Sequence, residues 1–182
     1  GLMMGTRPGS LDPGILLDVQ RRHGLTIENL GQILNYQSGL LGVSGLSSDV
    51  RQLEAAAQSG HDRSRLALDI FVDRVRSTIG ALTVTMGGLD ALIFTAGVGE
   101  NSEWVRSSVC DGLECLGLQL DQTRNSSAQP DSDIASAESP SRILVIQSRE
   151  DLMIVRETSG VLKSAGQICE TTNPQTEIGE NR

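Results

Sequence analysis

The sequence predicts an α/β fold in which helices pack against a sheet. Two short apolar runs, residues 90–94 and 142–147, contain β-branched side chains and are typical of buried strands. Several longer segments repeat apolar residues at spacings of three and four, as amphipathic helices do. With 182 residues and 2% aromatic side chains, the chain can form one domain with an aliphatic core. We expect this domain to span residues 1–164, followed by a polar, disordered tail over residues 165–182.

Composition and charge exclude several classes of partner. The formal net charge of −8 leaves no basic surplus for non-specific nucleic-acid binding. No segment has the length of a membrane span, and no secretory signal precedes the first loop, so we expect neither nucleic acid nor membrane as a partner. Cys110, Cys115 and Cys169 form neither a CxxC pair nor a metal-binding spacing with histidine, which predicts reduced thiols and a cytoplasmic location.

The first fourteen residues, GLMMGTRPGSLDPG, are a loop rich in glycine and proline around Arg7. A constrained loop holds its arginine in place, and the planar guanidinium is suited to phosphate and carboxylate oxygens. Arg7 is therefore a candidate oxyanion clamp. The alternative is a surface arginine in a mobile N-terminal segment.

Two short helices are expected next. The first begins with Asp12 as N-cap, continues to His23 and stops at Gly24. The second is capped by Thr26 and ends before Gly39. Both carry apolar residues at helical spacing and are expected to be packing elements.

A small and flexible connection is expected over residues 40–48, followed by a helix over residues 49–59. Ser47 or Ser48 is a suitable N-cap for this helix, and Asp49 complements its dipole. These local roles are sufficient to explain a Ser-Ser-Asp sequence without a ligand.

The strongest helical pattern covers residues 62–86 and ends at Gly87-Gly88. His61 and Asp62, before it, are expected to be solvated. The apolar side chains of this helix recur at spacings of three and four and are expected to face the core: Leu68, Phe71, Val75, Ile79, Leu82 and Met86.

A strand, a glycine turn and a helix start follow one another between residues 90 and 106. Gly97 and Gly99 allow a sharp turn and the close approach of a ligand to the main chain. The helix is expected to begin at Ser102 and end at Leu116, so free N–H groups and the positive end of its dipole face the turn. This arrangement predicts an anion site, with an ordinary strand-to-helix turn as the alternative.

The same turn also imitates a dinucleotide-binding fingerprint. Gly97, Gly99 and Ser102 follow a strand, and Asp121 ends the next short strand, at residues 118–120. The third glycine is missing, however, and no βαβ unit opens the chain. An NAD-dependent oxidoreductase is the weaker alternative, and a titration with ATP and with NAD separates the two.

Residues 121–142 are almost entirely polar and are expected to form a long exposed excursion. After the strand that follows, a helix is expected from Ser148 to Leu162, with Leu152 and Val155 toward the core.

Glu150 and Asp151 lie at the start of this helix. Two carboxylates in the first turn complement the helix dipole, and at the end of a strand they are also suited to hold magnesium. Sequence pattern alone leaves both alternatives open.

Taken together, these segments resemble the acetate kinase family from Gly1 to about Val161. Residues 1–14 resemble its second signature, SGLLGVSGLSSDVR (38–51) its nucleotide-contacting segment, and DALIFTAGVGENSEWVR (90–106) its adenosine-binding turn. Glu150 follows the last strand, as in the family. The four features also occur in the family's order.

The resemblance implies part of an actin-like (acetate/sugar kinase superfamily) ATPase domain that is incomplete on its N-terminal side. The implied reaction is reversible transfer of the ATP γ-phosphoryl group to acetate, giving acetyl phosphate and ADP, with Mg²⁺ or Mn²⁺. Arg7 would stabilise the transferring phosphoryl group and bind the substrate carboxylate, and Glu150 would hold the metal. The implied nucleotide-site residues are Asp49, Val50, Arg51, Gly97, Val98, Gly99, Glu100 and Asn101.

The chain also departs from the family pattern. Arg7 is followed by Pro8-Gly9-Ser10 where the family usually has Ser-Gly-Asp, and Val50 stands where an aromatic residue is common. The family's catalytic aspartate, active-site histidines and phosphate-binding glycine loop have no counterpart here, so we expect little or no kinase activity from this chain alone.

The resemblance implies a homodimeric parent protein. A butyrate or propionate kinase and a non-catalytic nucleotide-binding fragment remain the alternatives within this family.

Overall fold

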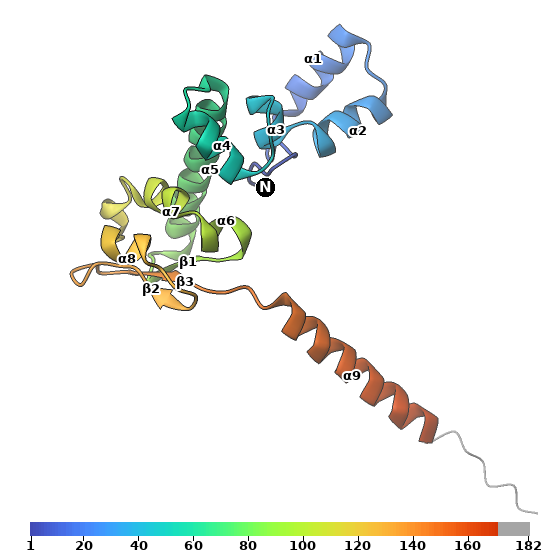
Figure 1. Ribbon diagram of the computed structural model, residues 1–182. Coiled ribbons are helices and arrows are strands. Elements are labelled where there is room, and N and C mark those ends of the chain that lie inside the picture. Colours follow the sequence, from blue (N-terminus) through green and yellow to red (C-terminus); the bar gives the residue numbers. More distant parts are fainter. Residues whose placement is uncertain (171–182) are drawn as a thin grey trace, which may run out of the picture. The chain divides into compact units, whose positions relative to one another are not determined.

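The structure, a computed structural model, describes residues 1–170 (Figure 1). The chain divides into two units, Gly1–Gln147 and a second that begins at Ser148. Of the tail expected over residues 165–182, the part after Glu170 lies outside the described residues, and the preceding part completes a helix.

The first two helices begin and end at the predicted residues. Helix α1 spans Pro13–His23, with the Asp12 carboxylate accepting a hydrogen bond from the Gly14 N–H at 2.6 Å. Gly24 ends it in the left-handed conformation. Helix α2 spans Ile27–Tyr36, and its Thr26 cap accepts from the Asn29 N–H at 3.2 Å. Local capping chemistry was therefore sufficient to predict both helices.

The connection predicted to be flexible contains a helix, α3 (Gly39–Ser44), so that prediction was wrong. Its first turn is held by the N-terminal loop: the Leu40 N–H donates to the Met4 carbonyl and the Leu41 N–H to the Gly5 carbonyl. Gly39 has a φ of +62°, and a Cβ atom there would overlap the loop backbone. Small residues in this segment therefore permit close packing on the loop.

Helices α4 (Val50–Gln58) and α5 (Asp62–Met86) follow. The N-cap of α4 is Asp49 rather than Ser47 or Ser48, so that expectation was wrong, whereas His61 and Asp62 are exposed as expected and His61 also caps α5. The Asp49 carboxylate accepts from the Arg51 N–H at 2.9 Å, and the His61 ring accepts from the Ser64 N–H at 3.2 Å.

Helix α5 has the predicted bounds but only part of the predicted core face. Leu68 is buried, whereas Leu82 and Met86 are 55% and 64% exposed. A helix of 25 residues is about 37 Å long. Its packing partners, helices α3, α4 and α7, are much shorter and cover only part of α5. The apolar residues near its C-terminal end therefore stay exposed although they continue the helical spacing.

The two predicted strands are confirmed and pair in parallel. Strand β1 (Ala91–Phe94) lies beside β3 (Arg142–Val145), with Phe94 opposite Val145, and β2 (Ser132–Asp133) adds antiparallel to β3. The order is β1-β3-β2. The core around the sheet and α5 is aliphatic, as predicted; its largest fully buried apolar side chains are Leu53, Leu68, Leu118, Ile134, Ile143, Val109 and Val145.

The helix predicted from Ser102 to Leu116 is divided. It consists of α7 (Glu103–Cys110) and a 3₁₀ turn, η1 (Glu114–Leu116), preceded by a separate helix α6 (Ala96–Asn101). Instead of a strand, residues 118–120 form isolated bridges, from Leu118 and Leu120 to residues 141 and 135. Shorter elements therefore replace the predicted helix and strand.

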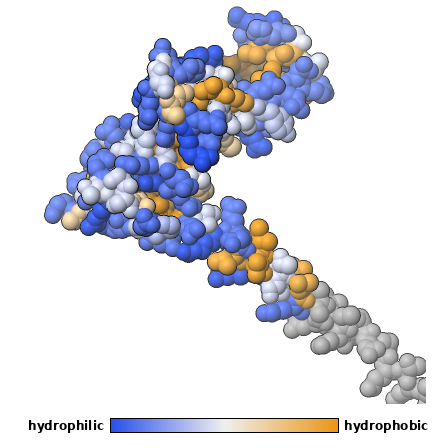
Figure 2. Space-filling model, viewed as in Figure 1, coloured by the Kyte–Doolittle hydropathy of each residue, from blue (hydrophilic) through white to orange (hydrophobic). Residues whose placement is uncertain are grey.

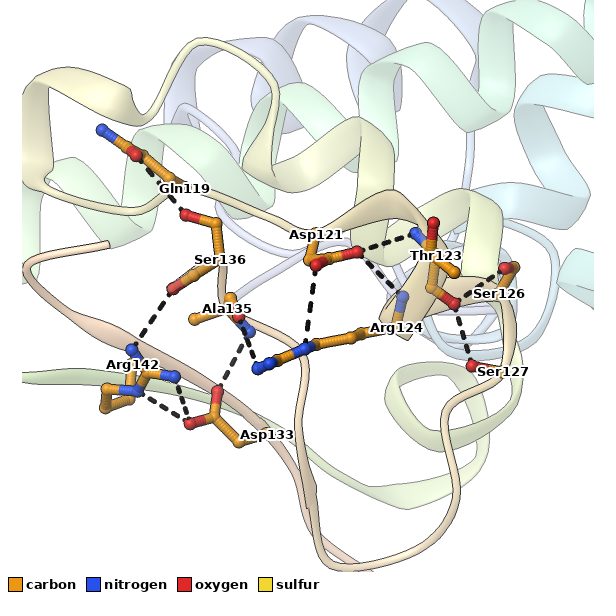
Figure 3. Close-up of polar contacts among 10 residues, drawn as sticks. All are labelled: Gln119, Asp121, Thr123, Arg124, Ser126, Ser127, Asp133, Ala135, Ser136 and Arg142. Carbon is orange, nitrogen blue, oxygen red and sulfur yellow. Dashed lines mark hydrogen bonds and ion pairs between the residues drawn. The ribbon is translucent and has the colours of Figure 1, made fainter. Parts of the chain in front are cut away.

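The long exposed excursion predicted over residues 121–142 is instead folded (Figure 3). It contains α8 (Gln122–Ser126) and β2, and Ile134 and Ala135 within it are buried. An ion pair joins Asp133 to Arg142, with Nε 2.7 Å from the carboxylate, and Arg124 donates to the Ala135 carbonyl. These polar contacts, which join residues 9 to 11 positions apart, order a segment with little apolar content.

The second unit consists of α9 (Glu150–Glu170), which extends past the predicted end at Leu162. Within it, Leu152 and Val155 are exposed, so their prediction as core residues was wrong. Figure 2 shows the apolar side chains along the visible face of this helix. Across the described residues, no helix is both long enough and apolar enough to span a bilayer.

The two cysteines of the first unit differ in environment. Cys110 is buried at the end of α7, where burial raises the pKa of its thiol to about 12, and Cys115 is exposed. Since the thiolate is the reactive form, we expect iodoacetamide at mildly alkaline pH to modify Cys115 and spare Cys110 in the folded protein. Peptide mass spectrometry measures both sites, and urea should make Cys110 reactive. Equal modification of the two thiols in native buffer would contradict the described burial.

Candidate functional site

A pocket of about 540 Å³ brings together two segments that lie far apart in the sequence. One wall is the start of α4, and the other is formed by α6 and the start of α7. The volume is within the range of small-molecule sites. Its lining residues are Ser48, Asp49, Val50, Arg51, Gly97, Val98, Asn101 and Ser102.

The α4 wall is held by an ion pair between neighbours. Arg51 donates Nε and Nη2 to the two oxygens of Asp49, at 3.2 and 2.7 Å. These hydrogen bonds lower the pKa of Asp49, and the carboxylate raises the pKa of Arg51. Both side chains remain accessible at the rim, whereas Val50 is buried behind them. The wall therefore offers a charged edge and an apolar base.

The second wall, formed by α6 and the start of α7 and called the turn wall below, differs from the predicted glycine turn. Helix α6 begins directly after β1, and the left-handed residue is Ala96, with a φ of +58°, rather than Gly97 or Gly99. Gly99 serves a close approach instead, because a Cβ atom there would lie 3.2 Å from the Phe94 backbone. Gly97 has open space where a Cβ atom would stand, and it lines the pocket. The glycines thus permit close packing on one side and leave room for a ligand on the other.

Asn101 and Ser102 complete the turn wall. The Asn101 amide donates to the Gly97 carbonyl at 2.9 Å, which closes α6 on itself. Ser102 caps α7 as predicted, since its hydroxyl oxygen accepts from the Val105 N–H at 3.0 Å. The same hydroxyl donates to Glu54 of α4 at 2.6 Å, so a hydrogen bond joins the two walls.

Beneath the turn lies a buried arginine, Arg106, which is 3% exposed. Its Nη1 donates to the carbonyls of Gly99 and Glu100, and its Nε and Nη2 donate to the side-chain and main-chain oxygens of Asn125. Burial lowers the pKa of Arg106, which reflects the cost of desolvating a cation. Four hydrogen bonds offset this cost and attach the turn to α8.

Arg7 lies outside this pocket. It lines a separate hollow of about 470 Å³ with Met4, Leu11, Leu16, Leu34 and neighbouring loop residues. The loop itself is fixed, because the Met4 N–H donates to the Arg7 carbonyl and the Ser38 N–H to the Thr6 carbonyl. Its Gly5 lies against Ser48 of the pocket wall, where a Cβ atom would come within 3.2 Å. The loop backbone therefore contacts the pocket, while the Arg7 side chain is exposed.

Glu150 is the first residue of α9 and belongs to the second unit, where it is exposed beside Asp151. Of the described residues, no group of three or more histidine, cysteine, aspartate or glutamate side chains is placed to hold a metal. Glu150 and Asp151 therefore offer two carboxylates rather than a complete set of metal ligands.

Two predicted nucleotide-site residues, Gly99 and Glu100, do not line the pocket, since their carbonyls face Arg106. Two residues that sequence analysis missed, Glu54 and Arg106, support its walls. The i, i+4 spacing of Val50 and Glu54 was a usable signal, because it places Glu54 on the helix face that carries Val50.

Solved structures share this fold. Acetate kinase from Porphyromonas gingivalis superposes with a TM-score of 0.84 at 39% identity, covering 89% of this chain and 41% of that chain. A propionate kinase from Francisella tularensis superposes with a TM-score of 0.78 at 37% identity, covering 85% of this chain and 39% of that chain. The fold is therefore part of an actin-like α/β domain, the class that the family resemblance implies.

Sequence comparison gives the family. The acetokinase family model matches residues 1–156. An acetate kinase from Cyanothece sp. is 50% identical, covering 92% of this chain and 41% of the relative, and one from Gloeobacter violaceus is 53% identical, covering 86% and 39%. The chain belongs to the acetokinase family, and it spans about 40% of the length of these relatives.

Proposed function

We propose that this protein contributes the nucleotide site of an acetate kinase, which transfers the γ-phosphoryl group of ATP to acetate and releases ADP and acetyl phosphate. The observation that carries the proposal is the pocket in which the α4 start and the turn wall meet. Both walls come from segments that resemble the family's nucleotide-contacting motifs, and the family match supports that resemblance.

Different residues would bind the nucleoside and neutralise charge on the transferring phosphoryl group. This reaction depends on positioning and charge neutralisation more than on covalent chemistry. Asp49, Val50 and Arg51 would bind the nucleoside from one wall, and Gly97, Val98 and Asn101 from the other. Arg7, on its fixed loop, would neutralise charge on the transferring phosphoryl group and orient the substrate carboxylate.

Gly99 and Glu100 would act through their backbone, by giving the turn its shape.

Magnesium is part of this proposal. Mg²⁺ keeps several waters and is commonly bound through one or two carboxylates plus substrate phosphates. Glu150, with Asp151 beside it, fits that requirement without a larger ligand group. When bound, the ion would supply charge neutralisation at the phosphates, and Mn²⁺ would serve the same role.

The proposal also includes the state of the whole enzyme. We propose that it is a homodimer and that it lies in the cytoplasm.

A chimera tests the proposed activity. Residues 1–156 replace the matching segment of the Cyanothece acetate kinase, and acetyl phosphate formation from ATP and acetate is measured. We expect turnover that depends on acetate and on Mg²⁺. A folded chimera without turnover would contradict the proposal, with the unaltered Cyanothece enzyme as the control.

Two alternatives are tested, one on the chimera and the other on the chain itself. The structural similarity to the Francisella propionate kinase favours propionate as a second candidate substrate. The ratio of the chimera's rates with acetate and with propionate decides between the two substrates. For the nucleotide, calorimetric titration of the chain with ADP and with NAD separates a kinase site from a dinucleotide site. Binding of NAD without binding of ADP would overturn the nucleotide assignment.

A further inference from the structure

The two walls of the pocket are each fixed to the body of the first unit. Helices α4 and α7 both pack on α5, and buried Leu53 and Val105 lie in the shared core. The turn is attached to α8 through Arg106 and Asn125. Neither attachment passes through the pocket itself, so a contact that joins the two walls directly adds a further constraint on the width of the pocket.

A short hydrogen bond makes that connection. The Ser102 hydroxyl, 5% exposed, donates to Oε1 of Glu54 at 2.6 Å, across 48 positions of sequence. Hydrogen bonds from a hydroxyl to a carboxylate are shorter and stronger than those between neutral groups. Because Ser102 also caps α7, the bond fixes the helix start as well as the side chain. Glu54 does not line the pocket, and so it is suited to holding a wall rather than touching a ligand.

We propose that Glu54 is a positioning residue for nucleotide binding: by holding Ser102, it sets the spacing between the α4 wall and the turn wall. This inference rests on the proposed function, since it takes a nucleotide as the ligand of the pocket. Val50 and Arg51 on one wall and Gly97 and Asn101 on the other contact the ligand together only at the correct spacing.

The test is calorimetric titration of the whole chain with ADP. Glu54→Ala removes the acceptor, and we expect binding about tenfold weaker, as for loss of a charge-assisted hydrogen bond. Glu54→Gln keeps an oxygen that accepts from Ser102, and we expect its affinity to stay within about twofold of the unmodified chain. Gln58→Ala, at the exposed end of the same helix, is the matched control and should leave the affinity unchanged.

A double-substitution cycle identifies the pair. Ser102→Ala should weaken ADP binding at least as much as Glu54→Ala, because it also removes the α7 cap, and adding Glu54→Ala to it should weaken binding no further, because the shared bond is already lost. If Glu54→Ala does not fold, Glu54→Asp replaces it. That carboxylate is one methylene shorter, and we expect about threefold weaker binding with the fold kept.

The outcomes separate this inference from the proposed function. If the unmodified chain binds ADP and Glu54→Ala binds it equally well, with only its urea midpoint lowered, Glu54 is merely structural and the inference is overturned. If the unmodified chain binds no ADP, the nucleotide assignment fails and the inference fails with it. Weaker binding by Glu54→Ala and recovery in Glu54→Gln together support it.

Discussion

Arg7→Ala is expected to lower the turnover of the chimera about a thousandfold, the range typical of arginines that stabilise a transferring phosphoryl group. The Arg7 guanidinium has no ion-pair partner among the described residues, so its charge is available to a ligand. Its loop is held by hydrogen bonds to the start of α3, which keeps its backbone in place without a ligand. Initial rates of acetyl phosphate formation measure the effect.

Two controls accompany this prediction. Arg7→Lys keeps the charge but loses the planar fork, so we expect it to recover only part of the rate. Arg22→Ala removes an exposed arginine whose ion pair with Asp18 lies on α1, and the rate should not change. Turnover of Arg7→Ala within about threefold of the parent would exclude a role in stabilising the transition state.

Local signals explain which parts of the fold could be predicted. Helices α1, α2 and α5 carry their own caps and spacing, and β1 and β3 are short apolar runs, so each was evident in the sequence. Helix α3 was missed because its first turn depends on the Met4 and Gly5 carbonyls, more than thirty positions earlier. The segment after Asp121 was missed for a similar reason, since Asp133 and Arg142 order it by pairing with each other.

The candidate site, too, could be predicted only in part from the sequence. Motif resemblance identified the segments around Asp49 and Gly97, and the structure brings both to one pocket. Resemblance did not indicate what supports them. The bond from Ser102 to Glu54 and the contact of Arg106 with Asn125 join residues 48 and 19 positions apart, and periodicity carries no signal for such pairs.

Arg106→Met is expected to cost about 4 kcal/mol of the free energy of unfolding. Methionine occupies a similar volume but donates no hydrogen bond, so the carbonyls of Gly99 and Glu100 and both Asn125 oxygens each lose the bond from Arg106. Of the two Asn125 oxygens, the main-chain carbonyl keeps a bond from the Ala128 N–H. Each buried acceptor left without a partner costs roughly 1–3 kcal/mol, partly relieved by relaxation. A loss of this size is a large share of the stability of a typical domain. Urea unfolding followed by circular dichroism measures it.

The matched control is Arg124→Met on the neighbouring helix α8. Arg124 donates to the Ala135 carbonyl and lies 3.7 Å from the Asp121 carboxylate, but its side chain is 49% exposed, so water replaces the lost partners. We expect this change to cost about 1 kcal/mol or less. Equal losses for Arg106→Met and Arg124→Met would mean that Arg106 contributes little to the fold. A larger loss at Arg106 alone would establish that the wall opposite α4 depends on a cation placed beneath it, away from the ligand.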